Sequence, residues 1–410
     1  MPPSIRIAIR FLLAKKRSMF MSLGGIAFGV GFFIVTLAQV SGFEEFFIQT
    51  ILGTDGAVRI EDRFQSTLAS VRSNSPFADN RSQRKYIEGV ENPDEIIEAL
   101  TAVPNVAGTS VVLKDSASID SPLRSSRIQV YGIIASDHIG VSQLEGQIRM
   151  GSIQRFQETP TGIIIGAKVA DRIKAHVGDS VIIRVGDQQN RYRVSGIFET
   201  GVSDIDKVRV FMHLGQARSL FKKPHGVSFI QVSLFDRDRA REDAETIENI
   251  TSHIASAWQD REKSWLEVFR AFKITGSIMV STIILISGLG MFNTLAMIVM
   301  EKTREIAILR SMGYTRQDIS NVFLWQGAVV LVVGTILGFL LGAAITYGIS
   351  SVPLRIRGIF STDNFVVNWS IMHYVYAGVT ASIIVMLSSL LPARRAARLV
   401  PGDVIRGTSS

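Results

Sequence analysis

The residue types that most often carry out chemistry are present in this chain, but not in catalytic arrangements. The six histidines lack the spacing of metal ligands, no serine lies in a GxSxG elbow, and there is no cysteine. The phosphate-cradling motif GxxxxGK(S/T) is also absent, so we expect no ATP hydrolysis by this chain. The sequence therefore indicates a protein without an enzyme active site, metal site or cofactor, which takes its energy from elsewhere.

A polar segment, Glu301–Asp318, interrupts the strongly apolar second half of the chain. Its sequence, EKTREIAILRSMGYTRQD, has a helical pattern, and Gly313 fits the left-handed position at which many helices end. Thr315 and Asp318 form an N-cap pair for a following helix. We therefore predict a short cytoplasmic helix that is held rigidly between two membrane spans, so that another protein can push on it.

Four long uncharged runs predict membrane-spanning helices. They are Ser18–Phe43, Ile274–Met300, Ile319–Leu354 and Asn364–Ala393. Each can hold the roughly 20 apolar residues that cross about 30 Å of hydrocarbon, and the mean hydropathy of +0.26 agrees. The first run could instead be a secretory signal. It is longer than the roughly 7–15-residue apolar core of such signals, which favours a retained span.

The placement of Lys and Arg predicts the topology. Basic residues gather before the first run, within the polar segment and after the last run. With four spans, all three groups lie on one side, and the positive-inside rule makes that side cytoplasmic, together with both termini. The loop between the third and fourth spans places Arg355 and Arg357 on the opposite side, and the larger basic groups outweigh them. We assign the net charge of +8 to this topology and not to nucleic-acid binding, because no basic cluster is interleaved with aromatic residues.

The expected fold is a membrane α-helical protein with four transmembrane helices and a large extracytoplasmic α+β domain. The predicted segments are a cytoplasmic amphipathic helix (1–18), the first span (19–42), the outside domain with stalk helices (43–273), the second span (274–300), the short cytoplasmic helix (301–318), the third span (320–350), an outside loop (351–370), the fourth span (371–393) and a cytoplasmic tail (394–410). In the first segment Ile5, Ala8, Ile9 and Leu12 share the apolar face.

Small residues recur at every fourth position in two of the predicted spans. They are Gly25 and Gly29 in the first span, and Gly334, Gly338 and Gly342 in the third. Such stripes let helices approach closely in lipid, so we predict packed interfaces at both. The sequence leaves open whether these interfaces form within one chain or between two.

Aromatic stripes at helical spacing flank the outside domain on both sides. Phe43, Phe46, Phe47, Thr50 and Ile51 follow the first span, and Gly53 is expected to end that helix. Trp265, Phe269 and Phe272 precede the second span. We predict that the two helices pack on each other as a stalk. The simpler alternative is that each packs only on the outside domain.

Within the outside domain, mixed patterns predict short helices and strands. The expected helices are 94–102, 167–175, 215–221 and 239–257, and the expected strands are 126–134, 162–165, 181–185, 192–198, 208–212 and 229–234. A tight turn is expected at Gly186 and Asp187. This mixture indicates an α+β domain with short connections.

Three segments resemble the MacB/LolC/LolE/FtsX group of ABC transporter permeases, also called type VII. They are MEKTREIAILRSMGYTRQDI (Met300–Ile319), LPARRAARLVPGDVIR (Leu391–Arg406) and IIIGAKVADRIKAHVGDSVIIRV (Ile163–Val185). The resemblance covers nearly the whole chain and implies a type VII fold in the bacterial inner membrane. Within the group, Val40–Gly53 is similar to the segment after the first span of the lipoprotein-releasing permeases LolC and LolE.

The resemblance also implies partners. The first segment is similar to the family's coupling helix, which docks on a cytoplasmic ABC ATPase dimer that binds ATP and magnesium. We expect the coupling residues to be Glu301, Arg304, Glu305, Arg310, Gly313 and Thr315. ATP-driven closure is then expected to pull the stalks together and to move apolar cargo between two permeases, a second copy or a paralogue. We expect the cargo cavity and stalk to include Phe43, Phe46, Phe47, Ile51, Trp265 and Phe269.

One departure from LolC-type chains concerns the periplasmic carrier LolA. In those chains a long, proline-containing loop after the VGD element captures the carrier, whereas here only Gly186–Asn190 joins Val185 to Arg191. Carrier capture by this segment is therefore not expected.

The function implied is extraction of lipoproteins from the inner membrane for transfer toward the outer membrane. Two alternatives stay open. The first is a MacB-like permease of a tripartite efflux or secretion system with a periplasmic adaptor, and the second is an FtsX-like regulator of cell-wall hydrolases.

Overall fold

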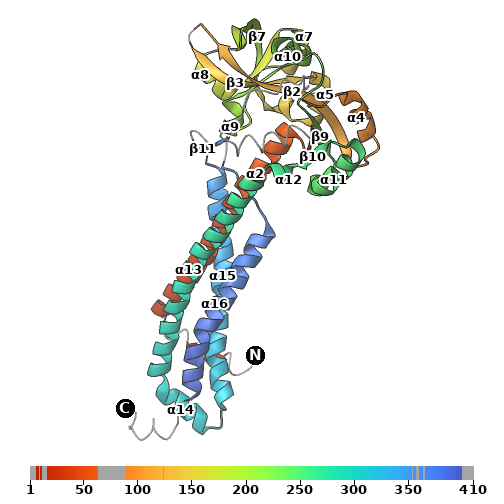
Figure 1. Cartoon of the computed structure of the whole chain (residues 1–410). Coiled ribbons are helices and arrows are strands. Elements are labelled where there is room, and N and C mark those ends of the chain that lie inside the picture. Colours follow the sequence, from red (N-terminus) through yellow and green to blue (C-terminus); the bar gives the residue numbers. More distant parts are fainter. Residues whose placement is uncertain are drawn as a thin grey trace, which may run out of the picture. The chain divides into compact units, whose positions relative to one another are not determined.

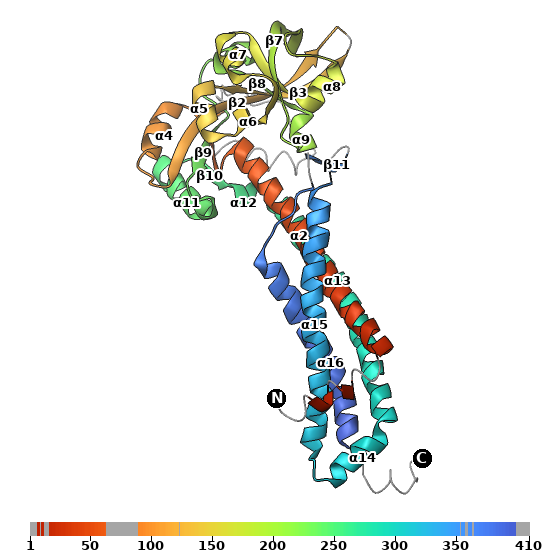
Figure 2. The ribbon, with the colours of Figure 1, turned by 180° about the vertical axis from the view of Figure 1, so that it is seen from behind.

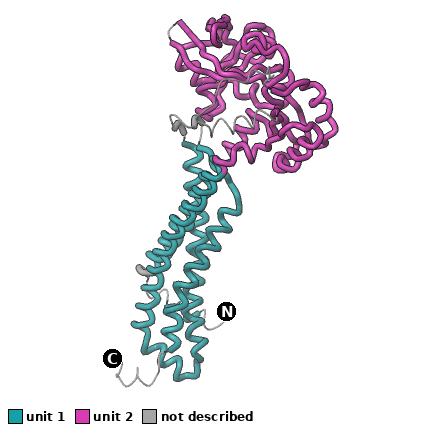
Figure 3. The backbone as a smooth tube through the Cα atoms, in the orientation of Figure 1, with its two compact units in different colours: residues 1–45, 267–353, 364–410 teal, residues 46–266, 354–363 magenta. Residues whose placement is uncertain are grey.

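The computed structural model describes residues 6–8, 10–11, 16–62, 89–122, 124–352, 354–356, 360–362 and 365–398. The chain divides into two compact units, each described by itself below (Figure 3). The bundle unit comprises residues 1–45, 267–353 and 364–410. The sheet unit comprises residues 46–266 and 354–363.

Among the described residues, four helices are long and apolar enough to cross a membrane, as predicted. They are α2 (Lys16–Asp55), α13 (Lys263–Glu301), α15 (Arg316–Ser350) and α16 (Ile371–Ala397). Their best windows have mean hydropathies of 1.8 to 2.6, with at most two charged residues each. A shorter helix, α14 (Thr303–Ser311), connects α13 to α15, and α15 packs along α16 (Figures 1 and 2).

The glycine stripes lie in helix–helix contacts inside one chain. A β-carbon at Gly334 would lie 3.0 Å from Cγ2 of Ile26, and one at Gly338 would lie 2.7 Å from Cβ of Val30. The stripe of α15 therefore packs against α2. The two glycines of α2 face α13, where β-carbons at Gly25 and Gly29 would lie 2.8 Å from side-chain atoms of Ser287 and Ile284 respectively. For Gly342 the nearest atoms belong to the backbone of Gly31, at 3.1 and 3.2 Å from a β-carbon built at this position.

The described N-terminal residues 6–8 and 10–11 are helical. Ala8 and Phe11 are buried in the hydrophobic core of the bundle unit, while Arg6 and Arg10 are exposed. The apolar side of this segment is thus covered by protein at these two residues. Ile5, Ile9 and Leu12, predicted to share that side, lie outside the described residues.

Helix α2 ends later than the sequence indicated. It continues through Gly53 to Asp55, and Gly56 takes the left-handed conformation (φ +68°), with its N–H donating to Leu52 O at 3.2 Å. Gly53 serves a different purpose, because a β-carbon there would lie 2.9 Å from Oε1 of Gln143. The prediction that Gly53 ends the helix was wrong because the glycine accommodates a tertiary contact.

The sheet unit is built on a mixed ten-stranded sheet with the order β10-β1-β9-β2-β3-β8-β5-β7-β4, in which β6 pairs with β2 and β7. Its strands are β1 (Val58–Glu61), β2 (Val106–Asp120), β3 (Ser125–Ile133), β4 (Ile148–Gly151), β5 (Gly162–Gly166), β6 (Ser180–Val185), β7 (Gln188–Phe198), β8 (Arg209–His213), β9 (Phe229–Leu234) and β10 (Ile254–Ala257). Among these, the β3–β8 and β5–β7 pairs are parallel and the other pairs are antiparallel. A separate hairpin joins β11 (Leu354–Ile356) to β12 (Phe360–Thr362).

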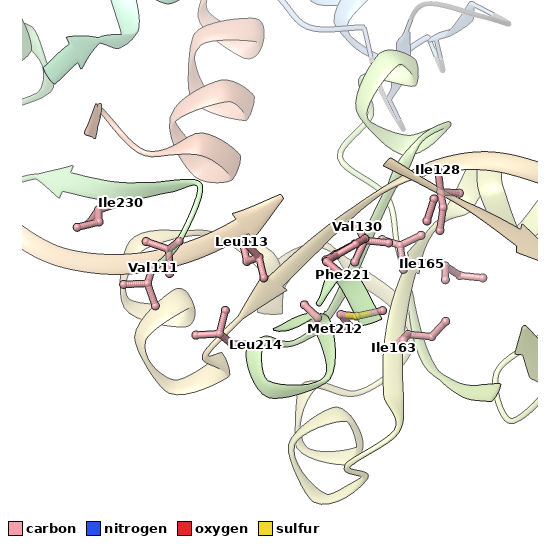
Figure 4. Close-up of a cluster of buried hydrophobic side chains, with 14 of the residues drawn as sticks. Val111, Leu113, Ile128, Val130, Ile163, Ile165, Met212, Leu214, Phe221 and Ile230 are labelled. Atoms are coloured by element: carbon pink, nitrogen blue, oxygen red, sulfur yellow. The ribbon is translucent and has the colours of Figure 1, made fainter. Parts of the chain in front are cut away.

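Short helices complete the sheet unit. They are α4 (Pro93–Leu100), α5 (Ala135–Val141), α6 (Leu144–Gln147), α7 (Ile153–Glu158), α8 (Ala167–Ile173), α9 (Ser203–Asp206), α10 (Leu214–Phe221), α11 (Ala240–Thr251) and α12 (Trp258–Arg261), with a 3-10 turn at Arg237–Arg239. The core between sheet and helices is apolar (Figure 4). In it, β2 contributes Val111 and Leu113, β3 Ile128 and Val130, β5 Ile163 and Ile165, and α10 Leu214 and Phe221.

Several elements of the sheet unit differ from the predicted pattern, since strands β1, β4 and β10 and helices α5, α6, α7, α9 and α12 were not predicted. The expected helix 239–257 ends at Thr251, because Ser252 adopts a left-handed conformation (φ +57°) and residues 254–257 form edge strand β10 against β1. The long strand β2 was not predicted. The predicted tight turn is present. Val185 pairs with Gln188, which leaves only Gly186 (φ +54°) and Asp187 between β6 and β7.

Candidate functional site

The connection between α13 and α15 has well-defined helix ends. Gly313 has φ +100°, and its N–H donates to Arg310 O at 3.2 Å, while Tyr314 N–H donates to Leu309 O at 3.2 Å. Thr315 and Asp318 then form a capping box, in which Asp318 N–H donates to Thr315 Oγ1 at 3.1 Å and Thr315 N–H donates to Asp318 Oδ2 at 2.9 Å. Both predicted end signals are confirmed.

One side of α14 is anchored in the bundle unit. Ile306 is part of its apolar core, and the neighbouring Ala307 is also buried. Arg310 donates from Nη1 to Ala397 O at 2.9 Å, which joins α14 to the last residue of α16. At the start of the connection Lys302 forms an ion pair with Glu305. Apolar packing and one charged hydrogen bond therefore fix the orientation of this short helix.

The opposite side of α14 is exposed. Among the predicted coupling residues, Glu301, Arg304, Glu305, Gly313 and Thr315 are exposed, whereas Arg310 is half-buried against α16. The sequence analysis missed two apolar side chains on this side, Ile308 and Met312, which are 46% and 73% exposed. Their spacing of four residues within a charged segment was the available signal, because such a pair shares one helix face.

The stalk residues of the bundle unit lie where α2 and α13 face each other. Glu44 of α2 forms an ion pair with Lys273 of α13, and Phe269 is buried. Phe43 instead contacts Phe365, with ring centroids 5.3 Å apart. The predicted pairing of the two helices is thus present in this unit.

In the sheet unit the same pairing continues. The rings of Phe47 and Trp265 lie 5.3 Å apart, and Phe47 and Ile51 are buried while Phe46 is half-buried. The prediction that the two stalk helices contact each other is confirmed. A role of these side chains toward cargo stays a prediction.

A buried charge network surrounds the end of α2 in the sheet unit. Asp55 accepts two hydrogen bonds from Arg209 of β8, at 2.9 and 3.3 Å, and Arg59 of β1 lies 3.7 Å away. Arg261 of α12 donates to Gly56 O at 2.9 Å, and Gln231 of β9 donates to Thr54 O at 3.4 Å. The last carbonyls of a helix lack partners within it and carry partial negative charge. Gln231 satisfies Thr54 O, and Arg261 also donates to Asp55 O at 3.4 Å. We name this set the junction network.

The pKa values of the charged groups in and beside the junction network shift in different directions. Burial alone would lower the pKa of Arg209, but the Asp55 carboxylate outweighs it and raises that pKa above its ordinary value. Arg261 makes no such ion pair, and burial together with the nearby Arg59 lowers its pKa to about 10. Burial, with a smaller effect of Arg209, lowers the pKa of His138 to about 4, so this histidine is neutral at pH 7.

Two family models match the chain. The model described as "MacB-like periplasmic core domain" matches residues 19–250, and the model described as "FtsX-like permease C-terminal" matches residues 277–401. The first of these alone covers more than half of the chain, because it includes α2 and nearly all of the sheet unit.

Similar proteins align over nearly the full length. A protein from Xylella fastidiosa (strain 9a5c) named "Lipoprotein-releasing system transmembrane protein LolC" is 25% identical over 99% of both chains. The "Lipoprotein-releasing system transmembrane protein LolE" of Haemophilus influenzae is 24% identical over 93% of this chain and 92% of its own. The "Macrolide export ATP-binding/permease protein MacB" of Acinetobacter baylyi is 22% identical over 97% of this chain and 58% of its own. With four apolar helices and a mixed sheet unit as well, this chain belongs to the MacB/FtsX group of ABC transporter permeases.

Proposed function

We propose that this chain is the membrane subunit of a transporter that extracts lipoproteins from the bacterial inner membrane for transfer toward the outer membrane. A separate ATPase supplies the energy. The proposal on cargo is supported by the names of the similar LolC and LolE proteins, which align with this chain end to end. In this orientation both termini and α14 lie in the cytoplasm, and the sheet unit lies in the periplasm.

The observation that carries the proposal is the exposed side of α14. Ile308 and Met312 form an apolar pair, and charged Glu301, Arg304 and Glu305 surround it. Interfaces between proteins commonly combine an apolar centre with a polar rim. Because the other side of α14 is anchored to the bundle unit and to the end of α16, a force applied to this pair is transmitted and not absorbed.

The route of force in this proposal is helix α13. It is unbroken over 39 residues from Lys263 to Glu301, about 58 Å at 1.5 Å per residue. A displacement of α14 at one end of α13 would therefore move Trp265 and the stalk at the other. In the assembled transporter a second permease copy or paralogue completes the cargo cavity, and Phe43, Phe46 and Phe47 are the residues of α2 that we assign to it.

The short hairpin between β6 and β7 argues against capture of a periplasmic carrier by this segment. With only Gly186 and Asp187 in its turn, it offers no long loop to capture a LolA-like protein. We therefore assign carrier capture, where it occurs, to another part of the complex.

The proposal is tested first by purifying the tagged chain in mild detergent and identifying bound proteins and lipids by mass spectrometry. Recovery of an ABC ATPase together with triacylated lipoproteins supports it. An ATPase with a periplasmic adaptor and no lipoprotein favours the MacB-like alternative. Absence of any ATPase contradicts a transport function.

A second test uses Gly313→Val. No atom lies within 4 Å of a β-carbon at this position, so valine strains only the backbone, which has φ +100°. A left-handed conformation costs a non-glycine residue about 1–2 kcal/mol or more, so we expect α14 to lose its fixed orientation and ATP hydrolysis to be uncoupled from export. Gly290→Val is the matched control, because that site is equally open and has an ordinary helical backbone. Normal export by Gly313→Val would show that the coupling assignment is wrong.

A further inference from the structure

Two adjoining cavities lie in the sheet unit beside the end of α2. The larger, of about 480 Å³, is lined mainly by charged and polar residues of β1, β2, β3, β8 and α12. The smaller, of about 210 Å³, is lined on its apolar part by Phe47, Ile51 and Trp265 of the stalk helices. Asp55, Gln129, Arg209 and Glu262 line both. The cavities therefore place a charged compartment beside a partly apolar one, with these four residues between them.

The charged compartment has an excess of positive charge. Its cations are Arg59, Lys114, Arg209 and Arg261, and its acids are Asp55, Glu61 and Glu262. Asp55 is shared by Arg209 and Arg59, and Glu61 lies 3.5 Å from Arg59. Burial raises the pKa of the remaining acid, Glu262.

Two of the four cations have no acidic partner among the described residues. Lys114 directs its Nζ over the ring of Tyr131, 5.3 Å from the centroid, and has no ion pair in this part of the chain. Arg261 donates its hydrogen bonds to the backbone carbonyls of Ser256, Asp55 and Gly56. Two positive charges therefore line the cavity without a carboxylate of their own.

Two buried donors in the same wall also lack an acceptor in the described chain. They are the Nε–H groups of Arg59 and Arg209, whose guanidinium groups stack on Phe229 and Tyr131 at 4.3 and 4.2 Å. A buried donor without a partner is costly, and native structures rarely leave one unsatisfied. Anionic oxygens in the cavity would match the excess positive charge of its lining.

We propose that these cavities bind one amphiphile, with its phosphate or carboxylate group among Arg59, Lys114 and Arg261 and its apolar part against Phe47, Ile51 and Trp265. The inference builds on the proposed function, in which the cargo is lipid-modified, and it adds a site in the sheet unit that recognises an anionic head group. Occupancy of such a site would be sensed by the stalk helices, because Phe47, Ile51 and Trp265 form part of its apolar lining.

The test is a calorimetric titration of the full chain in nanodiscs of zwitterionic lipid. The probes are dihexanoyl phosphatidic acid, dihexanoyl phosphatidylcholine and inorganic phosphate, and empty nanodiscs correct for partition into lipid. We expect phosphatidic acid to bind one per chain, at least about tenfold more tightly than the other two, since it alone combines a head group of net negative charge with apolar chains. Equal binding of phosphatidylcholine would overturn the anionic site, and equal binding of inorganic phosphate would overturn the apolar half.

Variants at Lys114 localise the binding, because that side chain lines the cavity without holding the junction network together. Lys114→Gln should lower the affinity for phosphatidic acid at least about fivefold, because one charged hydrogen bond is lost. Lys114→Arg keeps the charge and should keep the affinity. Lys168→Gln in α8 is the control, since that half-buried lysine lines neither cavity. Unchanged binding by Lys114→Gln would show that the charges serve only to join the stalk to the sheet. The assay contains no ATPase and no lipoprotein, so its failure removes this site and leaves the proposed function to its own test.

Discussion

The two ends of helix α13 are surrounded by charged residues in opposite ways. Beyond Glu301, the connection through α14 exposes its charges and is held by buried apolar side chains, Ile306 and Ala307. Before Lys263, the junction network buries its charges, and these hold the structure together through Asp55 and Arg209. The first arrangement leaves charges exposed to another protein, and the second buries the Asp55–Arg209 ion pair within the chain.

Exposed and buried charges also differ in how much they contribute to the stability of the fold. Exposed ion pairs contribute about 0–1 kcal/mol each because water and salt screen them, whereas removal of one partner from a buried pair costs about 3–5 kcal/mol. The α14 region can therefore change its surface residues at little cost in stability. The junction network cannot, and this fits a joint that keeps its shape while force passes through the stalk.

The largest loss of folding stability is expected for Arg209→Met. The change leaves Asp55 buried with Arg59 as its nearest cation, 3.7 Å away, so the free energy of unfolding should fall by about 3–5 kcal/mol. Lys207→Met is the control, because its ion pair with Asp204 is exposed and should contribute less than about 1 kcal/mol. Pulse proteolysis in urea measures both. Equal losses for the two variants would remove the distinction between buried and exposed charges drawn here.

The next largest effect is a pH dependence of the free energy of unfolding, which comes from His138. Its ring is fully buried, Nδ1 lies 3.1 Å from Ser110 Oγ, and the charged groups that act on it are Arg209 and Asp55. The pKa is about 4 in the folded chain and about 6.5 in an unfolded one, so unfolding takes up a proton between these values. Stability should therefore fall as pH drops from about 6.5 to 4, by a total of about 3 kcal/mol.

His138→Gln isolates this contribution, because glutamine does not titrate. The difference between the unfolding curves of wild type and variant should depend on pH only in that window. A difference that stays constant from pH 7 to pH 4 would contradict a neutral buried His138.

A smaller effect is expected where the bundle unit joins α2 to α15. Gly338→Ala places a β-carbon 2.7 Å from Cβ of Val30 and 2.9 Å from Ala27 O, and overpacking of this kind costs about 1–3 kcal/mol. Gly348→Ala, in the same helix, meets nothing within 4 Å and should not destabilise the chain. Thermal unfolding in detergent compares the two. A loss of similar size in both would mean that helix packing at the stripe is looser than these distances indicate.

The sequence predicted the α14 region far better than the junction network. Gly313, Thr315 and Asp318 act on residues within one turn, so their types alone indicate the structure. The junction network joins residues far apart in the chain: Asp55 and Arg209 are separated by 154 positions, and Asp55 and Arg261 by 206. No local pattern marks such pairs, and these arginines read as ordinary surface charges.

The missed strand β2 has a related explanation. Its middle carries Lys114, Asp115 and Ser116, which look like a turn when read alone. In the structure Lys114 and Asp115 take part in side-chain contacts with Tyr131 and Lys223, so the sheet accommodates polar residues that a single strand would not. The four spans and most short strands were predictable because each is marked by its own apolar residues.

The smallest effect on stability, with a large effect on association, is expected for Ile308→Asn. The side chain is 46% exposed, so its replacement should change the free energy of unfolding by no more than about 0.5 kcal/mol. Recovery of the ATPase with the tagged chain should nevertheless fall strongly, because the apolar centre of the proposed contact is lost. Ile306→Asn is the matched variant on the other side of α14, where a buried polar group without a partner should destabilise the bundle itself. If Ile308→Asn kept the ATPase bound while remaining folded, the exposed side of α14 would not be the docking surface, and the contrast between the two ends of α13 would lose its functional meaning.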